Sequence, residues 1–166
     1  MPILPYRRRD AVAYAHTWAY ERNKAYYDFS ELGGDCTNFA SQCLYAGSGV
    51  MNFTETFGWY YRSSARRAPA WTGVHYFYNF ITRGRADAGP FGHEGPLWEL
   101  QPGDFIQISF DGRQYAHNPI VVDVQTPGVP EGILVAAHSI DSDWRPLSTY
   151  MYHHLRCILI DGCRRP

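Results

Sequence analysis

The sequence predicts an α+β fold in which helices come first and a mainly antiparallel sheet follows. Two observations support this. Apolar residues recur at helical spacing in three segments before residue 83, whereas residues 100–160 contain four short runs of strand-forming residues separated by turn signals. With 166 residues, of which 45% are hydrophobic, the chain is long enough for one sizeable core. We therefore expect residues 1–166 to form one domain.

Three helices are expected. The first covers residues 7–23, where Ala11, Tyr14, Ala15 and Trp18 fall on one helical face. The third covers residues 72–82, which carry a second such stripe and are followed by Gly84. Between them, the aromatic stretch 57–71 is expected to be a loop.

The second helix begins within the segment GGDCTNFASQCLYAG. Its apolar face follows the spacing i, i+3, i+4, i+7, i+8 and consists of Cys36, Phe39, Ala40, Cys43 and Leu44. Asp35 is a suitable N-cap and Gly47 a suitable stop. This places Cys36 in the first turn and Cys43 two turns further along the buried face.

Residues 84–96 are rich in Gly and Pro and are expected to form a surface loop. Strands are expected afterwards at residues 105–110, 116–124, 132–139 and 156–160. Asp111-Gly112 is a hairpin signal between the first two. The third and fourth strands are preceded by turn-forming or polar residues.

Charge and hydropathy argue against two classes of partner. The net charge is −1, from 15 basic and 16 acidic residues, and the Arg clusters lie far apart in sequence, so no nucleic-acid partner is expected. No window is apolar enough for a membrane span, and the first residues lack a signal-peptide pattern. A catalytic domain taken from a longer exported protein is compatible with these features. The oligomeric state cannot be read from the sequence.

Cys36 is the strongest candidate for chemistry. The first turn of a helix offers free N–H groups and a positive dipole, both of which stabilise a thiolate. A lone cysteine on an apolar helix face is more often a core residue, which is our expectation for Cys43. The Gly-Gly approach, Asp35 and two later histidines, His117 and His138, favour a catalytic role for Cys36.

The segment from Gly34 to Cys43, GDCTNFASQC, resembles the hallmark of bacterial amidase domains of type six. The resemblance extends over nearly the whole chain, through Tyr6-x-Arg8, Trp71, Leu100-x-Pro-Gly-Asp104 and the His138 segment with Arg145-Pro-Leu147. It implies a relationship to the CHAP and NlpC-type cell-wall hydrolases and a papain-like fold, with the nucleophile at a helix N-terminus packed on the sheet. It also implies a secreted or wall-associated protein and no cofactor.

Carried over to this chain, the resemblance implies Cys36 as the nucleophile, His117 as the general base and His138 as the residue that orients His117. Two antiparallel strands joined by a turn bring together residues equidistant from its centre, and the midpoint of 117 and 138 falls in the turn at 126–132. Pro119 departs from the expected pattern. Because proline cannot donate a ladder hydrogen bond, the strand should be an edge or bulged near His117.

Three further residues are candidates for substrate binding. Asp35 can cap the helix or bind an ammonium group of the substrate. The resemblance implies that Tyr26 or Tyr27, shortly before the nucleophile, can help to hold an oxyanion. Either can instead pack in the core, and the N–H of Cys36 is a more secure donor. Trp59 lies in the aromatic stretch with Tyr60 and Tyr61, which can line a groove or belong to the core.

The remaining cysteines and histidines indicate no metal site, since their spacing is unlike that of structural zinc modules. Cys157 and Cys163 could form a disulfide if the domain is exported. The predicted function is hydrolysis of amide bonds, with bacterial peptidoglycan as the substrate implied by the resemblance. Two alternatives remain open: an inactive wall- or partner-binding module, and an acyl transferase.

Overall fold

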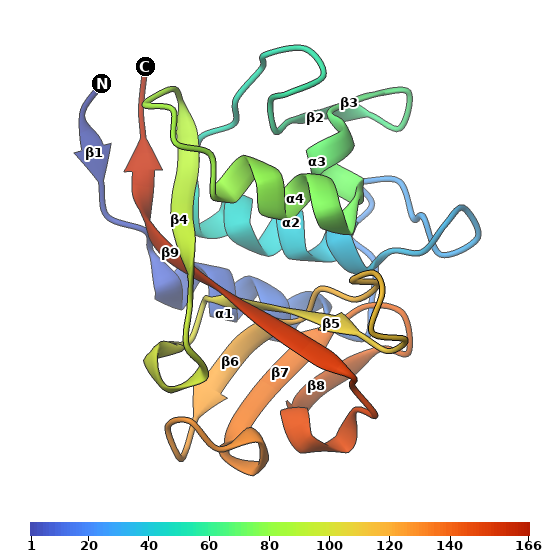
Figure 1. Ribbon diagram of the computed structural model, residues 1–166. Helices are drawn as coiled ribbons and strands as arrows, with labels where there is room; N and C mark the ends of the chain where they lie inside the picture. The colour runs from blue at the N-terminus through green and yellow to red at the C-terminus, as the bar shows by residue number, and fades with distance from the viewer.

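The computed structural model describes all of residues 1–166 and combines four helices with a curled antiparallel sheet (Figure 1). The strand order is β1-β9-β5-β6-β7-β8, and β4 also pairs with β9. The sheet strands are β1 (Ile3–Leu4), β4 (Gly89–Gly95), β5 (Phe105–Ser109), β6 (Ile120–Val124), β7 (Ile133–Ala137), β8 (Ser142–Pro146) and β9 (His154–Arg164). The predicted α+β class is confirmed, although the helices do not all come first, because β1 precedes α1 and two short strands lie between α2 and α3.

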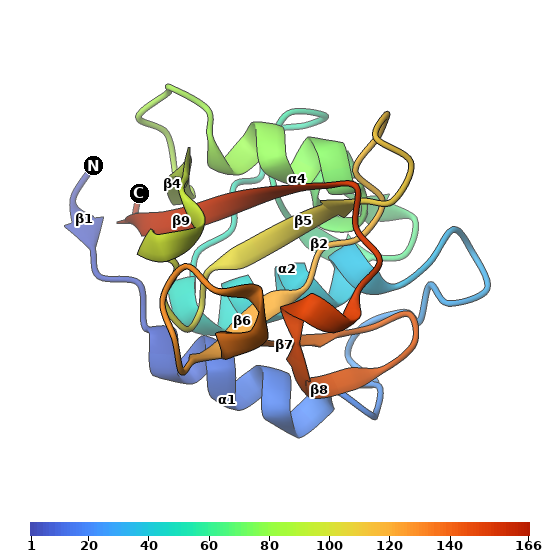
Figure 2. The same ribbon diagram turned by 60° about the horizontal axis from the view of Figure 1, so that its bottom comes forward.

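The helices are α1 (Arg8–Trp18), α2 (Cys36–Ser48), α3 (Pro69–Thr72) and α4 (Val74–Ile81). One large apolar cluster joins α1, α2 and α4 to one face of the sheet, including Phe39, Phe105 and Ile120. A smaller cluster covers the other face and includes Ile108, Val121 and Tyr150. Figure 2 shows α1 running beneath the sheet strands. No helix is long and apolar enough to cross a membrane.

Helix α2 starts at Cys36 as predicted and ends at Ser48, and the next residue, Gly49, adopts the left-handed conformation (φ 70°) that closes helices. The predicted stop at Gly47 was wrong by two residues. Gly47 lies inside the helix, and a Cβ there would come within 2.3 Å of the Tyr6 ring. The absence of a side chain at Gly47 allows the Tyr6 ring to pack closely against the helix.

Several elements differ from the prediction. The first helix ends at Trp18, not at residue 23. Residues 84–96, expected as a loop, contain β4, which pairs along β9 and has a bulge between Phe91 and Gly92. At Gly92 a Cβ would lie 2.1 Å from the Leu159 carbonyl oxygen, so glycine here permits a close strand contact. The aromatic stretch also forms a hairpin, β2 (Tyr61–Ser63) and β3 (Arg66–Arg67).

The register of β6 decides where the two candidate histidines point. The ladder to β5 pairs Phe105 with Ile120 and continues past Pro119 as a single bridge between Ile108 and His117. The ladder between β6 and β7 ends at the pair Ile120–Ala136. The segment before Ile120 is therefore unpaired on the side of β7, which agrees with the edge position expected from Pro119. Because side chains alternate between faces, His117 shares a face with Val121, and His138 shares the helix-covered face with Ala136.

Candidate active site

Cys36 lies at the N-terminus of α2, against the chain segment that carries His117. Its Sγ is 3.9 Å from the carbonyl oxygen of Ala116 and 3.8 Å from Thr37 Oγ1. Burial raises the pKa of the thiol, while the Thr37 hydroxyl and the backbone N–H groups of Thr37 and Asn118 act in the opposite direction. The resting thiol is therefore protonated and surrounded by donors that favour the thiolate once it forms.

The first turn of α2 keeps its backbone donors free. The N–H groups of Cys36, Thr37 and Asn38 have no oxygen acceptor in the protein, and no side chain caps the helix. Such N–H groups, at the positive end of the helix dipole, can bind the oxyanion that develops when a thiolate attacks a carbonyl. This agrees with the expected role of the Cys36 N–H.

His117 is buried, and its ring contacts Tyr150 and Phe110. Its Nε2 lies 3.4 Å from the Tyr150 hydroxyl, and its Nδ1 makes no hydrogen bond. Arg145 stacks over the Tyr150 ring at 3.7 Å from its guanidinium carbon. No hydrogen bond joins His117 to Cys36 in this state, so the predicted pair shares a neighbourhood without direct proton contact.

The predicted orienting contact from His138 to His117 is absent. His138 Nδ1 lies 2.6 Å from Asp35 Oδ2, and its Nε2 lies 2.8 Å from the Trp18 carbonyl oxygen. The ring stacks on Phe39 at 4.0 Å between centroids. The reason is the register: residues 117 and 138 point to opposite faces of the sheet, so equal distance from the turn did not bring the rings together. The side chain that forms a hydrogen bond with His117 is that of Tyr150.

Asp35 is almost fully buried and does not cap α2 with its side chain. Its Oδ1 accepts hydrogen bonds from Phe29 N–H (2.8 Å) and Asn38 Nδ2 (2.9 Å), while Oδ2 faces His138. The expected side-chain cap is therefore absent, and both carboxylate oxygens face groups of the protein itself. Asp35 instead fixes the loop before the nucleophile, α2 and the end of β7 to one another.

Arg22 extends this buried cluster to the turn between β7 and β8. It makes two 3.0 Å hydrogen bonds to the Asp141 carboxylate, and its Nη1 lies 3.2 Å from His138 Nε2. Its Nε is 3.4 Å from Asp28 and 3.8 Å from Asp35. The sequence did not indicate this arginine, because its partners come from segments more than a hundred residues apart.

Trp59 was wrongly placed in a substrate groove. It is fully buried, packs on Trp71 at 4.8 Å between ring centroids, and donates a 3.0 Å hydrogen bond from Nε1 to Ser41. The core interpretation of this residue holds. Tyr26 is half-buried between Tyr61 and Trp71, and no hydrogen bond connects its hydroxyl to Cys36.

The other cysteines are free thiols. Cys43 is fully buried, as predicted, and burial raises its pKa well above the usual value. Cys157 and Cys163 lie on the same strand, β9, so six residues separate them by roughly 20 Å and no disulfide can join them. No group of three or more His, Cys, Asp or Glu side chains is arranged to hold a metal ion.

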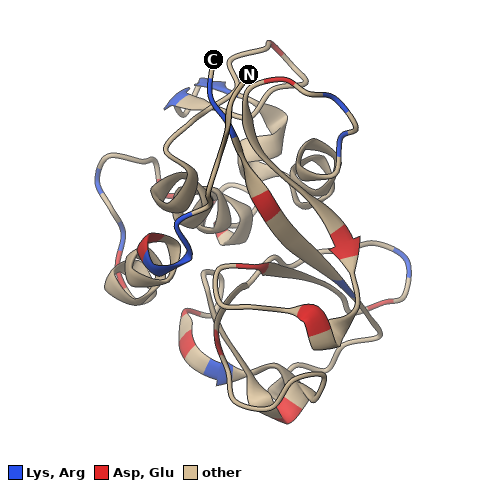
Figure 3. Cartoon of the chain, turned by 90° about the vertical axis from the view of Figure 1, so that its left-hand side faces the viewer, with Lys and Arg blue, Asp and Glu red and all other residues tan.

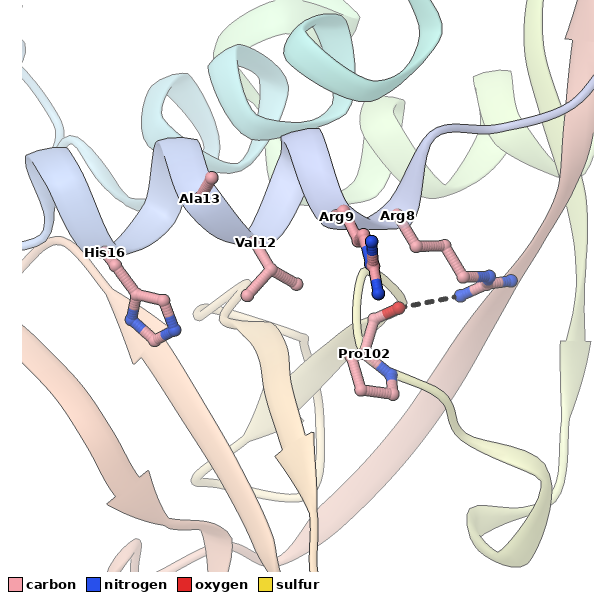
Figure 4. Close-up of a pocket in the computed structure, with 6 residues that line it drawn as sticks. All are labelled: Arg8, Arg9, Val12, Ala13, His16 and Pro102. Atoms are coloured by element: carbon pink, nitrogen blue, oxygen red, sulfur yellow. Dashed lines mark hydrogen bonds between the residues drawn. The ribbon is translucent and has the colours of Figure 1, made fainter.

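Other surface features lie away from Cys36. A pocket of about 410 Å3 on the outer side of α1 is lined by Arg8, Arg9, Val12, Ala13, His16 and Pro102, and Arg8 donates a 3.1 Å hydrogen bond to the Pro102 carbonyl (Figure 4). None of the predicted site residues lines it. In Figure 3, basic and acidic residues are scattered over many elements and do not gather in one strip.

Comparison with known proteins places this site in a family. The sequence profile of the family described as "Putative amidase domain" matches residues 5–160. The chain belongs to this amidase domain family. It is also similar to the uncharacterized protein YhbB of Bacillus subtilis (strain 168), with 34% identity over 143 residues. That match covers 84% of this chain and 43% of YhbB, so the chain spans less than half of its curated relative. No solved structure matches it.

The amidase assignment gives His117 a testable pH dependence. Burial, and to a lesser extent Arg145, lower the pKa of His117 from its ordinary 6.5 to about 4. In the expected role of general base, His117 must be neutral to accept the thiol proton, so in that role kcat/KM should fall only as the pH drops through about 4. A pH–rate profile of the purified protein measures this, and an acid limb near 6.5 would contradict it.

Proposed function

We propose that this chain is a cysteine-dependent amidase that forms an acyl-enzyme on Cys36. The observation that carries the proposal is the position of the thiol, at a helix N-terminus with free N–H groups and beside the segment of His117. The family supports amide bonds as the target. The proposed substrate is bacterial cell-wall peptidoglycan, and the proposed location is outside the cell or at the wall; both rest on the resemblance to CHAP and NlpC-type hydrolases, with their papain-like fold.

In the proposed reaction, His117 accepts the proton of Cys36 as the thiolate attacks the amide carbonyl carbon. The carbonyl oxygen becomes an oxyanion that the first-turn N–H groups of α2 stabilise. The proton then passes from His117 to the leaving nitrogen, and the C–N bond breaks. Water, deprotonated by His117, hydrolyses the thioester and restores the thiol. Because no hydrogen bond joins His117 to the thiol in this structure, we propose that the two side chains come within reach when substrate binds. Catalytic hydrogen bonds are often longer in ligand-free enzymes than in their complexes.

The direct test is digestion of purified peptidoglycan followed by mass spectrometry of the new termini. A new amine and a new carboxyl group at one amide bond support hydrolysis, and their identity locates the bond. Product in which an added amine replaces water would indicate acyl transfer. Unchanged wall material, with unchanged synthetic peptide amides, would contradict the proposal.

Two observations favour the alternative of a binding module: burial raises the pKa of the thiol, and no hydrogen bond joins Sγ to an imidazole. The rate of alkylation by iodoacetamide separates the two functions. A catalytic Cys36 should react much faster than the fully buried Cys43 and in a manner that depends on His117. Equal, slow rates at both positions would favour the binding module.

Tyr150 is expected to orient His117, since its hydroxyl is the hydrogen-bond partner of Nε2. Tyr150→Phe should lower kcat by about tenfold while KM changes little, because the ring packing remains and only one hydrogen bond is lost. Tyr152→Phe, at an exposed tyrosine two residues away, is the matched control and should behave as the parent. If Tyr150→Phe retained full kcat while His138→Gln lost it, the orienting role would return to His138.

A further inference from the structure

A polar pocket of about 590 Å3 lies between the segment 22–28 and the β2–β3 hairpin. We call it the Tyr26–Tyr61 pocket. The two tyrosine rings that define it are 5.1 Å apart between centroids, and each lies 5.9 Å from the ring of Trp71. This aromatic floor is packed against the core, so the pocket is formed before any ligand arrives.

The pocket is tied to the first turn of the nucleophile helix. Asn38, two residues after Cys36, donates from Nδ2 to the Tyr27 carbonyl oxygen (2.9 Å) and accepts from Trp71 Nε1 (3.0 Å) at its Oδ1. The Tyr27 N–H in turn donates to the Tyr61 hydroxyl oxygen (2.9 Å). A ligand in this pocket therefore contacts a wall that shares hydrogen bonds with the turn that holds the thiol.

The side chains of the pocket have donors to spare. Lys24 and Arg62 make no ion pair or hydrogen bond, and Arg62 is held over the Phe53 ring at 4.3 Å. The Tyr61 oxygen already accepts a bond, which leaves its hydrogen free to donate. The Tyr26 hydroxyl has no partner, and burial raises its pKa to about 12, so it remains a donor at neutral pH.

Several of the side-chain acceptors, by contrast, already accept hydrogen bonds from the protein. Asn23 Oδ1 accepts from the Ala25 N–H (2.9 Å), and Ser63 Oγ accepts from the Arg66 N–H (3.1 Å). Asp28, the one carboxylate in the lining, accepts two bonds from Ser30 at Oδ1, which also lies 3.4 Å from Arg22 Nε; its Oδ2 makes no hydrogen bond. The unpaired hydroxyl donors and the unpaired cations of the pocket together favour a ligand that accepts hydrogen bonds and is negatively charged.

We propose that the Tyr26–Tyr61 pocket binds a free carboxylate of the amide substrate, with Lys24 and Arg62 supplying the charge and Tyr26 and Tyr61 the hydroxyl donors. The proposal rests on the proposed function for its statement that the ligand is the substrate of Cys36. It narrows the substrate class to peptides or related amides that carry a carboxylate near the scissile bond.

Binding without turnover tests the site separately from the reaction. N-acetylalanine and its neutral isostere N-acetylalaninamide are titrated into the Cys36→Ala variant, and binding is followed by NMR chemical shifts. The acid should bind about tenfold more tightly than the amide at low salt, because only the ionised carboxylate can accept charge-assisted hydrogen bonds from the pocket. Lys24→Gln and Arg62→Gln should each reduce this preference, and the double variant should abolish it. Arg165→Gln, an exposed arginine outside the pocket, should leave it unchanged.

Equal binding of the two probes, or a preference that survives in the double variant, would overturn the carboxylate site. Stronger binding of inorganic phosphate than of N-acetylalanine would overturn the assignment to a carboxylate. If the carboxylate preference is found but no amide is hydrolysed by the parent protein, the proposed function fails while the site stands. If hydrolysis occurs with equal kcat/KM for paired acid and amide substrates, the site fails and the amidase stands.

Discussion

Cys36→Ala is expected to lose at least roughly 10⁴-fold in turnover of an amide substrate, the scale of loss seen when a covalent nucleophile is removed. Alanine suits the first turn of a helix, and the thiol makes only two long polar contacts, so the fold should remain. Steady-state hydrolysis and circular dichroism of the same preparation measure the two quantities.

Cys43→Ala is the matched control for this prediction. Cys43 lies on the same helix, is fully buried and faces the apolar core, so its truncation should reduce stability and leave the chemistry unaffected. Full turnover by a folded Cys36→Ala variant would exclude an acyl-enzyme on this residue. Loss of turnover in a stable Cys43→Ala variant would reassign the nucleophile.

Asp35→Ala is expected to reduce the free energy of unfolding by about 3–5 kcal/mol, the usual result of removing one partner from a buried ion pair. The change leaves His138 and part of Arg22 without their carboxylate, and it removes the acceptor of Phe29 N–H and Asn38 Nδ2. Since Cys36 follows directly in the chain, turnover should fall with it. Urea denaturation measures the stability loss.

The His93–Asp161 pair provides the comparison. Its 2.7 Å contact is nearly as short as the 2.6 Å contact of Asp35 and His138, but both side chains are about half exposed. Asp161→Ala should therefore change the free energy of unfolding by at most about 1 kcal/mol. If both alanine variants were equally stable, the buried cluster would not be the support for α2 that the structure indicates.

Sequence patterns predicted the elements whose residues alternate or repeat clearly. Helix α2 and the central strands β5, β6, β7 and β9 were found because apolar spacing reports directly on burial. Strand β4 was missed because its sequence, GPFGHEG, lacks alternation and owes its pairing to close contact with β9. Local sequence contains no information on a partner about 70 residues away.

Only the local part of the candidate site could be predicted, because the sequence pattern reports on local structure and not on distant partners. The position of Cys36 follows from helix periodicity and a motif, both of which are local. The partners of His117 and His138 depend on register and face, which a one-residue shift inverts. Tyr150 and Arg22 meet the histidines through contacts that span 33 and 116 positions, and nothing in their own neighbourhoods marks them.

Strand β9 has a consequence for how the chain folds. This C-terminal strand pairs with β1, β4 and β5, and Arg8 in the first helix donates to its Ile160 carbonyl at 2.8 Å. Contacts of such long sequence separation slow folding, because a large loop must close before they form. A nascent chain in which β9 is still inside the ribosome has no partner for β1, β4 or the outer edge of β5, so we expect the sheet to be completed only once β9 has emerged. Until then the exposed edges are open to association with other chains.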